Sequence, residues 1–348
     1  MIKPYLLIPF LVCHLYLHTQ QAVDFHINIG QATLEFNDES RSRPLKTEIW
    51  YPTTDSIKDS DKYITPFIRG YTVRNAALPN TKLPLILLSH GNGGNRLSLE
   101  WLAQGLVRQG YIVAAVDHWG NTFDHPIAQE FVKPWERPLD ISYVLTALLK
   151  DKRYQSIIDE HKIGAAGFSY GGYTVLALAG AVLDYKLLFE FYNSPEGKKE
   201  INSIAEFPNL WDQLQDPALV EMTQNLPALK DNRIKAFLAI SPGTARGFNN
   251  PQQFKEINDP LFIIGAEADQ VTPVESFARK YHQLIANSTY YEFSGQVGHY
   301  VMLAEANEEM KKELPEPFAD HPSVDRKKIH AKVAALSAEF FNKHLRKK

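Results

Sequence analysis

Residues 163–172 read IGAAGFSYGG, in which a short apolar run leads into a G-x-S-x-G motif. The run predicts a buried strand, and the small and apolar residues of 170–182 predict a buried helix. A serine between a strand and a helix sits on a sharp turn, so the residues two before and two after it must be small. Gly167 and Gly171 meet this requirement. The motif predicts that Ser169 is a nucleophile; the alternative is an ordinary glycine-rich turn.

The same succession of an apolar run and a helical segment recurs on both sides of this motif. Fully apolar strands that alternate with helices predict the α/β class, with a mostly parallel central sheet and helices on both faces. No period of about 20–50 residues repeats, which argues against solenoids and propellers. The expected strands are 85–89, 112–116, 163–166, 236–240, 261–264 and 289–293, and the expected helices are 99–107, 139–150, 170–182, 274–285 and 324–345.

Two stretches depart from this alternation. Residues 25–29, 33–36 and 48–51 alternate polar and apolar side chains, as antiparallel edge strands do. Residues 183–232 contain four prolines between short helical pieces. We expect this second stretch to be a helical insert, or cap, on the carboxyl edge of the sheet. Its aromatic side chains are expected either to form a lid over an apolar pocket or to seal a small core of their own; they are Phe189, Phe191, Tyr192, Phe207 and Trp211.

Residues 1–22 read MIKPYLLIPFLVCHLYLHTQQA and have the pattern of a signal peptide. Lys3 supplies the positive start, and the apolar run after it is too short to span a bilayer of about 30 Å. Lipidation of Cys13 is not expected, because Val12 precedes it where a small residue is required. We therefore expect a secreted or periplasmic protein without a stable membrane span, in which residues 23–348 form one α/β domain. The alternatives are an uncleaved anchor or a partly buried first strand.

The composition is that of a globular protein, with 44% hydrophobic and 22% charged residues, and it excludes disordered and collagen-like chains. The net charge of −3 leaves no basic surface to dominate an encounter with nucleic acid, so no such partner is expected. The single cysteine excludes an intrachain disulfide framework and a zinc site built on thiolates.

A glycine-rich turn, residues 90–94 (HGNGG), follows the expected strand 85–89. Such a turn can present a backbone N–H to an oxyanion, while the second N–H comes from the residue after the nucleophile, Tyr170. Asn92 is the preferred first donor, and Gly93 is the less favoured one. The alternative is a phosphate-binding nest, but the G-K-[ST] ending of a P-loop is missing.

A carboxylate and a histidine follow the last two expected strands. Asp269, just beyond strand 261–264, is the preferred acid to orient a histidine, with Glu267 in reserve and helix capping as the alternative. His299 lies on a loop beyond the last strand. The order Ser, Asp, His is that of the α/β-hydrolases, and all these features lie at strand ends where open α/β sheets place their sites. The sequence thus predicts a triad of Ser169, Asp269 and His299.

Several stretches resemble the serine α/β-hydrolases grouped as predicted dienelactone hydrolases, which are similar to the platelet-activating-factor acetylhydrolase and polyester-cleaving cutinase branches. The resemblance runs from about Leu83 to Tyr300. It implies an esterase or lipase fold, with the triad named above and with no cofactor. The stretches are HGNGG, GYIVAAVDHWGNTFDH, RPLDISYVL, GFSYGG, IKAFLAISPG and GAEADQVTP.

This chain departs from that family pattern at two places. Dienelactone hydrolases use a cysteine nucleophile, whereas the turn here carries Ser169. In the acetylhydrolase branch the acid follows the strand after the nucleophile helix, where this chain has Ser241 and no carboxylate. The acid is therefore expected later, at Asp269, as in the cutinase-like branch.

The expected function is the hydrolysis of carboxylic esters, of a small molecule or a lipid, through an acyl-enzyme intermediate. The alternatives are a peptidase or an acyltransferase on the same scaffold, or a non-catalytic binding protein with a hydrolase fold.

Residues outside the expected triad have other expected roles. His118, Asp124 and His125 offer a metal site, which we regard as the lesser reading beside a loop that shapes the substrate pocket, with Trp119 and Phe123 as its wall. Arg137 and Asp140 are expected to form a structural ion pair near the sheet edge.

Overall fold

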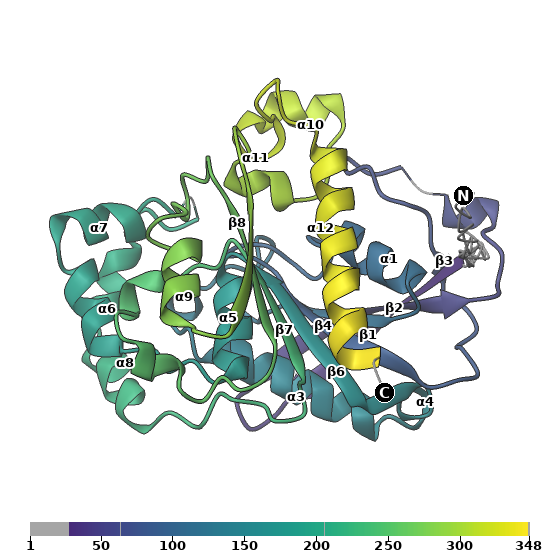
Figure 1. The fold of residues 1–348 in the computed structure, drawn as a ribbon, viewed down its shortest axis with the longest axis horizontal. Helices are drawn as coiled ribbons and strands as arrows, with labels where there is room; N and C mark the ends of the chain where they lie inside the picture. The colour runs from purple at the N-terminus through teal and green to yellow at the C-terminus, as the bar shows by residue number, and fades with distance from the viewer. Residues whose placement is uncertain (1–27, 63, 205, 347–348) are drawn as a thin grey trace, which may run out of the picture.

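A single nine-stranded sheet runs through the computed structural model, which describes residues 28–62, 64–204 and 206–346 (Figure 1). The expected signal peptide, residues 1–22, lies outside the described residues. The strand order is β3-β1-β2-β5-β4-β6-β7-β8-β9. The strands are β1 (Asn28–Asp38), β2 (Arg43–Thr53), β3 (Val73–Arg74), β4 (Leu83–Ser89), β5 (Ile112–Val116), β6 (Ile158–Phe168), β7 (Ala236–Ile240), β8 (Leu261–Ala266) and β9 (Ser288–Phe293).

The sheet is parallel over its central and C-terminal part and antiparallel near its N-terminal edge. Strands β5, β4, β6, β7, β8 and β9 pair in parallel, whereas β2 is antiparallel to both β1 and β5. The predicted mostly parallel sheet with an antiparallel edge is confirmed. The prediction of two separate edge strands before residue 37 is wrong, because β1 pairs with β2 without a break. Gly30 does not interrupt β1; it leaves room for the ring of Tyr51, which a methyl carbon at Gly30 would approach to 2.4 Å.

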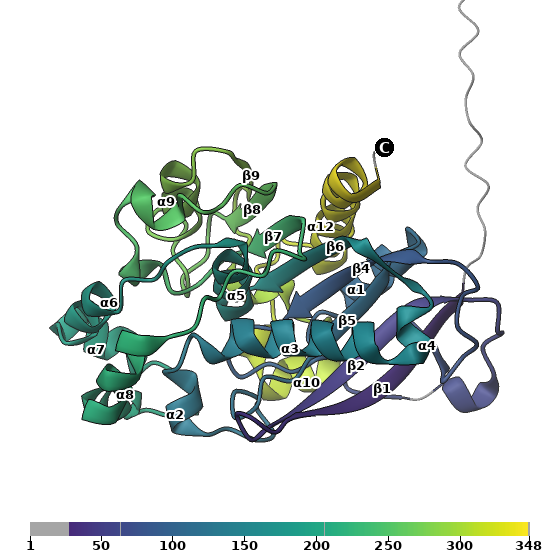
Figure 2. The ribbon, with the colours of Figure 1, turned by 90° about the horizontal axis from the view of Figure 1, so that it is seen from below.

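Helices cover both faces of the sheet because alternate residues of its strands point to opposite sides. In β4, Leu85 and Leu87 pack in the core beneath α3 and α5, whereas Ile86 and Leu88 pack in the core beneath α1 and α12. Figure 2 shows α3 and α12 on opposite sides of the strands. These four helices are α1 (Glu100–Arg108), α3 (Glu136–Lys150), α5 (Tyr170–Ala179) and α12 (Arg326–Phe341).

Several element ends differ from the prediction. Helix α5 stops at Ala179 because Gly180 takes a left-handed conformation, with φ 117°, which ends a helix. Helix α9 begins at Ala278 and not at residue 274. Strand β6 extends five residues further toward the N-terminus than its apolar run.

None of the helices in the described ranges is long and apolar enough to cross a membrane. The remaining helices outside residues 183–232 are α2 (Ala128–Phe131), α4 (Lys152–Gln155), α9 (Ala278–Leu284), α10 (Glu308–Glu313) and α11 (Pro315–Phe318).

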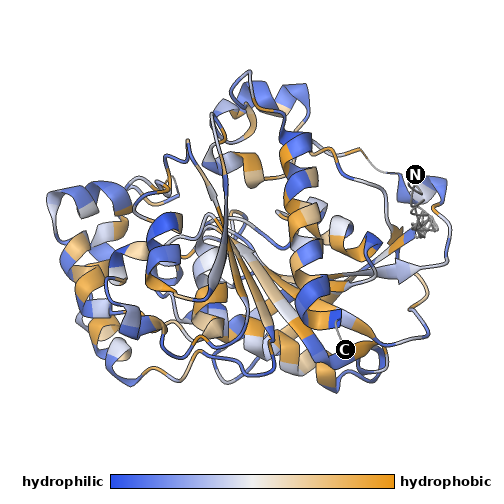
Figure 3. Cartoon of the chain, in the orientation of Figure 1, coloured by the Kyte–Doolittle hydropathy of each residue, from blue (hydrophilic) through white to orange (hydrophobic). Residues whose placement is uncertain are grey.

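In its described residues, the stretch 183–232 contributes no strand to the sheet, and it lies to one side of it, at the left of Figure 1. Its partly buried aromatic side chains, Phe189, Tyr192, Phe207 and Trp211 among them, pack around a small separate core that also holds Phe131 and Trp135. Four of the five aromatic side chains named above thus help to seal a small core, whereas Phe191 lies against the Arg246 guanidinium, 4.6 Å from its ring centre. In Figure 3 the central strands are largely apolar, whereas α7 and α10 are largely hydrophilic. The helices of this stretch are α6 (Tyr185–Tyr192), α7 (Pro195–Ile201) and α8 (Pro217–Met222).

A buried histidine between α12 and α1 gives a prediction for acid stability. His330 stacks on Trp101 with ring centroids 3.9 Å apart, and its Nε2 lies 2.7 Å from the carbonyl oxygen of Val301. Burial lowers the pKa of His330 to about 4. Between pH 6.5 and 4 the unfolded chain therefore binds a proton that the folded chain does not. The free energy of unfolding consequently decreases as the pH is lowered through this range. This residue should account for about 2 kcal/mol of the stability lost between pH 7 and pH 5.

The measurement is urea unfolding at pH 7 and pH 5, for the wild type and for His330→Gln. Glutamine keeps a donor for the Val301 carbonyl but does not titrate in this range. We expect the variant to lose less stability than the wild type on acidification. An equal loss in both proteins would contradict the prediction.

Candidate active site

The turn at Ser169 holds a backbone conformation that is rare outside glycine. Its φ is 55° and its ψ is −119°. The strain persists because the surroundings fix both peptide groups of the residue. The Ser169 N–H donates to the Ile240 carbonyl at the end of β7 (2.9 Å), and its carbonyl oxygen accepts from Gly172 (2.8 Å) and from Gly243 (2.8 Å). The hydroxyl is thereby presented between β6 and α5.

The two glycines that flank Ser169 face backbone atoms at very short range. A methyl carbon at Gly167 would lie 2.1 Å from the carbonyl oxygen of Gly171. A methyl carbon at Gly171 would lie 2.0 Å from the carbonyl oxygen of Ser89, at the end of β4. Backbone atoms cannot move aside as a flexible side chain can, so these positions admit no side chain without moving the turn.

The structure brings Ser169, His299 and Asp269 into one chain of hydrogen bonds. His299 Nε2 lies 3.0 Å from Ser169 Oγ, and His299 Nδ1 lies 2.7 Å from Asp269 Oδ2. All three side chains are buried, with 8%, 5% and 4% exposure respectively. Asp269 follows β8 and His299 follows β9, so adjacent parallel strands carry the two residues to the same edge of the sheet. Burial strengthens both hydrogen bonds, because little water competes for them.

Thr272 orients the carboxylate of Asp269, a role that the sequence analysis missed. Asp269 Oδ1 accepts from the backbone N–H of Thr272 (2.7 Å), and Asp269 Oδ2 accepts from Thr272 Oγ1 (2.8 Å). The signal was present in the sequence as a short polar residue three positions after an aspartate. Glu267, the reserve acid, instead accepts from the N–H of Gly295 at the surface.

The glycine-rich turn 90–94 lies against the nucleophile. A methyl carbon at Gly91 would lie 3.3 Å from Ser169 Cβ. The Gly93 N–H donates to Asn121 Oδ1 (3.2 Å), so this group is occupied. Within the described ranges, no hydrogen bond from the Asn92 N–H is found. The Tyr170 N–H belongs to the first turn of α5, whose donors have no acceptor within the helix.

A buried network of charged and polar groups lies behind this turn, and it differs from the expected ion pair. Asp140 does not pair with Arg137; it accepts two hydrogen bonds from Arg43, at 2.8 and 2.9 Å. The two residues are both on α3 but point to different partners. The Arg43–Asp140 pair joins strand β2 of the N-terminal edge to helix α3. Arg137 instead binds uncharged acceptors, among them the His90 carbonyl and Asn121 Oδ1.

Two neutral histidines complete this network. Burial, together with Arg137, keeps the pKa of both His90 and His118 well below the usual range. The neutral His118 ring donates from Nδ1 to Asp140 (3.0 Å) and accepts at Nε2 from Ser89 Oγ (2.8 Å). His90 donates from Nδ1 to the Gly91 carbonyl (2.7 Å) and accepts at Nε2 from the His118 N–H (3.2 Å).

These contacts do not suit the alternative of a metal site at His118, Asp124 and His125. Both ring nitrogens of His118 are engaged in hydrogen bonds, so neither has a free lone pair for a metal. The His125 ring packs on Trp119, with centroids 4.2 Å apart. Phe123, expected in a pocket wall, is 62% exposed.

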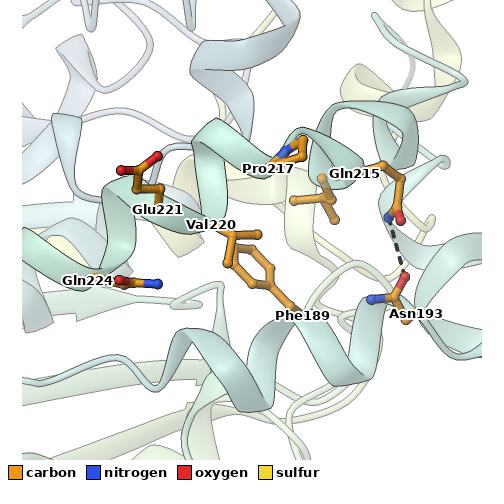
Figure 4. A pocket seen from close by; sticks show the side chains of 8 residues that line it. Phe189, Asn193, Gln215, Pro217, Val220, Glu221 and Gln224 are labelled. Atoms are coloured by element: carbon orange, nitrogen blue, oxygen red, sulfur yellow. Dashed lines mark hydrogen bonds between the residues drawn. The ribbon is translucent and has the colours of Figure 1, made fainter.

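Glu206, in the stretch 183–232, lies against the glycine-rich turn 90–94. Glu206 Oε1 packs against Gly93, where a methyl carbon would approach it to 2.2 Å. A separate hollow lies between α6 and α8 (Figure 4), where the Gln215 amide donates to Asn193 Oδ1 (3.3 Å). All residues that line this hollow fall within 189–224, so it is not the space above Ser169.

Comparison with known proteins gives the family. The model of the dienelactone hydrolase family matches residues 68–254. A search of curated proteins found no match. Among solved structures, a ferulic acid esterase from Streptomyces cinnamoneus is similar, with a TM-score of 0.60 and 20% sequence identity, over 92% of this chain and 91% of that chain. This likeness shows the α/β-hydrolase fold. Because the family model covers more than half of the chain, the chain belongs to the dienelactone hydrolase family and is an enzyme of the carboxylic ester hydrolase class.

Proposed function

We propose that the protein hydrolyses carboxylic esters through Ser169, His299 and Asp269, by way of an acyl-enzyme. The observation that carries this proposal is the continuous, buried chain of hydrogen bonds from Asp269 through His299 to Ser169. Its geometry matches the requirement that the nucleophile binds its base, and that a third group orients the base. The strained backbone at Ser169 adds support, because such strain occurs where a turn must hold a reactive group in place.

The proposed mechanism assigns one role to each group. His299 Nε2 takes the proton of the Ser169 hydroxyl as its oxygen attacks the ester carbonyl. Asp269 accepts from Nδ1–H, which fixes the tautomer and stabilises the imidazolium ion. The backbone N–H groups of Asn92 and Tyr170 bind the tetrahedral oxyanion. The imidazolium then protonates the departing alcohol, and His299 activates a water that releases the acyl group.

The substrate class of the proposal comes from the structural neighbour. The structural neighbour is a ferulic acid esterase, so esters of aromatic acids are the first to test. A panel of aryl and alkyl esters of rising chain length, beside amides and thioesters, separates an esterase from a peptidase or an acyltransferase. We also propose that residues 1–22 direct export, and that residues 183–232 cap the site, in line with the contact between Glu206 and Gly93.

Removal of the nucleophile is the first test. Ser169→Ala should lower kcat for a good aryl ester by at least about 10³-fold, because no other group on the turn can form the acyl-enzyme. The variant should fold normally, since alanine lacks only the hydroxyl. Ester hydrolysis by the purified variant at more than about 1% of the wild-type rate would sink the proposed mechanism.

Removal of the acid's charge is the second test. Asp269→Asn should lower kcat by up to about 10⁴-fold, because an amide can present its NH₂ to His299 and favour the wrong tautomer. Thr272→Val should have a smaller effect in the same direction, since it removes one hydrogen bond to the carboxylate. Glu267→Gln is the matched control, because Glu267 lies outside the triad and should keep wild-type kinetics. An Asp269→Asn enzyme as active as this control would show that another group is the acid.

A further inference from the structure

We propose that Asn121 is a positioning residue that holds the turn 90–94 in the conformation that receives the oxyanion, with the buried Arg137 as its anchor. The inference rests on the proposed function, because it assigns a role toward the same reacting oxygen. Asn121 lies on the loop after β5, outside the motifs from which the triad was predicted.

The amide of Asn121 binds two successive residues of the turn. Its Nδ2 donates to Asn92 Oδ1 (2.9 Å), and its Oδ1 accepts from the Gly93 N–H (3.2 Å). Arg137 Nη1 donates to the same Oδ1 at 2.9 Å. A backbone N–H and a guanidinium can only donate, so the atom that faces them must be the amide oxygen. Asn121 is 1% exposed, and its side chain is therefore fixed in one orientation by buried partners.

These contacts bear on the direction of the proposed oxyanion donor. The Asn92 N–H shares a peptide group with the Gly91 carbonyl, and the two bonds of a trans peptide point in opposite directions. The Gly91 oxygen is held inside the turn by His90 Nδ1 (2.7 Å) and by the Gly94 N–H (3.1 Å). The Asn92 N–H consequently points out of the turn. Asn121 holds the part of the turn that follows this peptide, because it binds the Asn92 side chain and the Gly93 N–H.

Arg137 joins both halves of the proposed oxyanion site. One guanidinium nitrogen donates to the His90 carbonyl, and another donates to Asn121 Oδ1. The guanidinium carbon lies 4.8 Å from the centre of the Tyr170 ring, and Tyr170 carries the second proposed N–H. Burial lowers the pKa of Arg137 to about 9, so the group is still a cation at pH 7.

Burial of the Arg137 charge does not favour the stability of the fold. Arg137 is 1% exposed, and within the described residues no carboxylate forms an ion pair with it. A buried cation without an ion-pair partner has a large desolvation penalty, which the nearby Asp140 carboxylate offsets only in part. The network instead fixes backbone groups before the substrate arrives, which is the condition under which oxyanion donors are effective.

The test compares Asn121→Ala with Asn250→Ala. Asn250 is exposed and caps the short helix Pro251–Phe254, so this control removes the same side chain at a surface position. We expect Asn121→Ala to lower kcat about 10- to 100-fold with KM within about threefold, because a misplaced donor weakens the transition state more than substrate binding. The affinity for a trifluoromethyl ketone, which forms a tetrahedral adduct with the nucleophile, should fall in parallel with kcat/KM. Asn250→Ala should change neither quantity.

A second variant keeps the inference testable if Asn121→Ala folds poorly. Asn92→Ala retains the backbone N–H but removes the partner of Asn121 Nδ2, and the side chain is only half-buried. It should lower kcat in the same way, and the double variant should lose less than the product of the two single losses.

The outcomes separate this inference from the proposed function. If the wild type hydrolyses esters and Ser169→Ala does not, but Asn121→Ala and Asn92→Ala keep the wild-type kcat and ketone affinity, Asn121 has no positioning role. A parallel rise in KM with unchanged kcat would equally overturn it. If Ser169→Ala is as active as the wild type, the proposed function itself fails.

Discussion

The carbonyl oxygen of Ser89, at the end of β4, meets the backbone of Gly171 so closely that no side chain fits between them. This approach of two main chains is the constraint on which the site depends. It brings the turn 90–94 beside Ser169, because both segments leave the carboxyl ends of adjacent parallel strands. Since neither backbone can yield, the sheet sets how closely the turn 90–94 approaches Ser169.

The rest of the fold supports this contact from both sides. Strands β7, β8 and β9 continue the parallel sheet and bring Asp269 and His299 to the same edge. On the other side, Arg43 from β2 binds Asp140 on α3, and Asp140 binds His118, which holds Ser89. The antiparallel edge therefore does more than extend the sheet. It anchors, through buried hydrogen bonds, the strand end against which the nucleophile turn packs.

Much of this architecture could be predicted because it depends on local pattern. Apolar runs gave the parallel strands, and the spacing of G-x-S-x-G gave a turn whose glycines have no room for side chains. What could not be predicted depends on tertiary contacts between distant residues. Arg137 and Asp140 are one helical turn apart and were expected to pair, but Arg43, 97 positions from Asp140, takes the carboxylate. Asn121 lies outside the motifs that predicted the triad, and its contacts with the turn 90–94 form only once the two loops are folded together.

The central claim is that Ser169 is an activated nucleophile, and a fluorophosphonate probe tests it most directly, because such probes react covalently with the hydroxyl of an activated serine. The intact protein should be labelled with one equivalent, and peptide mapping by mass spectrometry should place the label on Ser169. His299→Ala should label far more slowly, because the hydroxyl then has no base. An unlabelled wild-type protein, or a label on a different serine, would contradict the account.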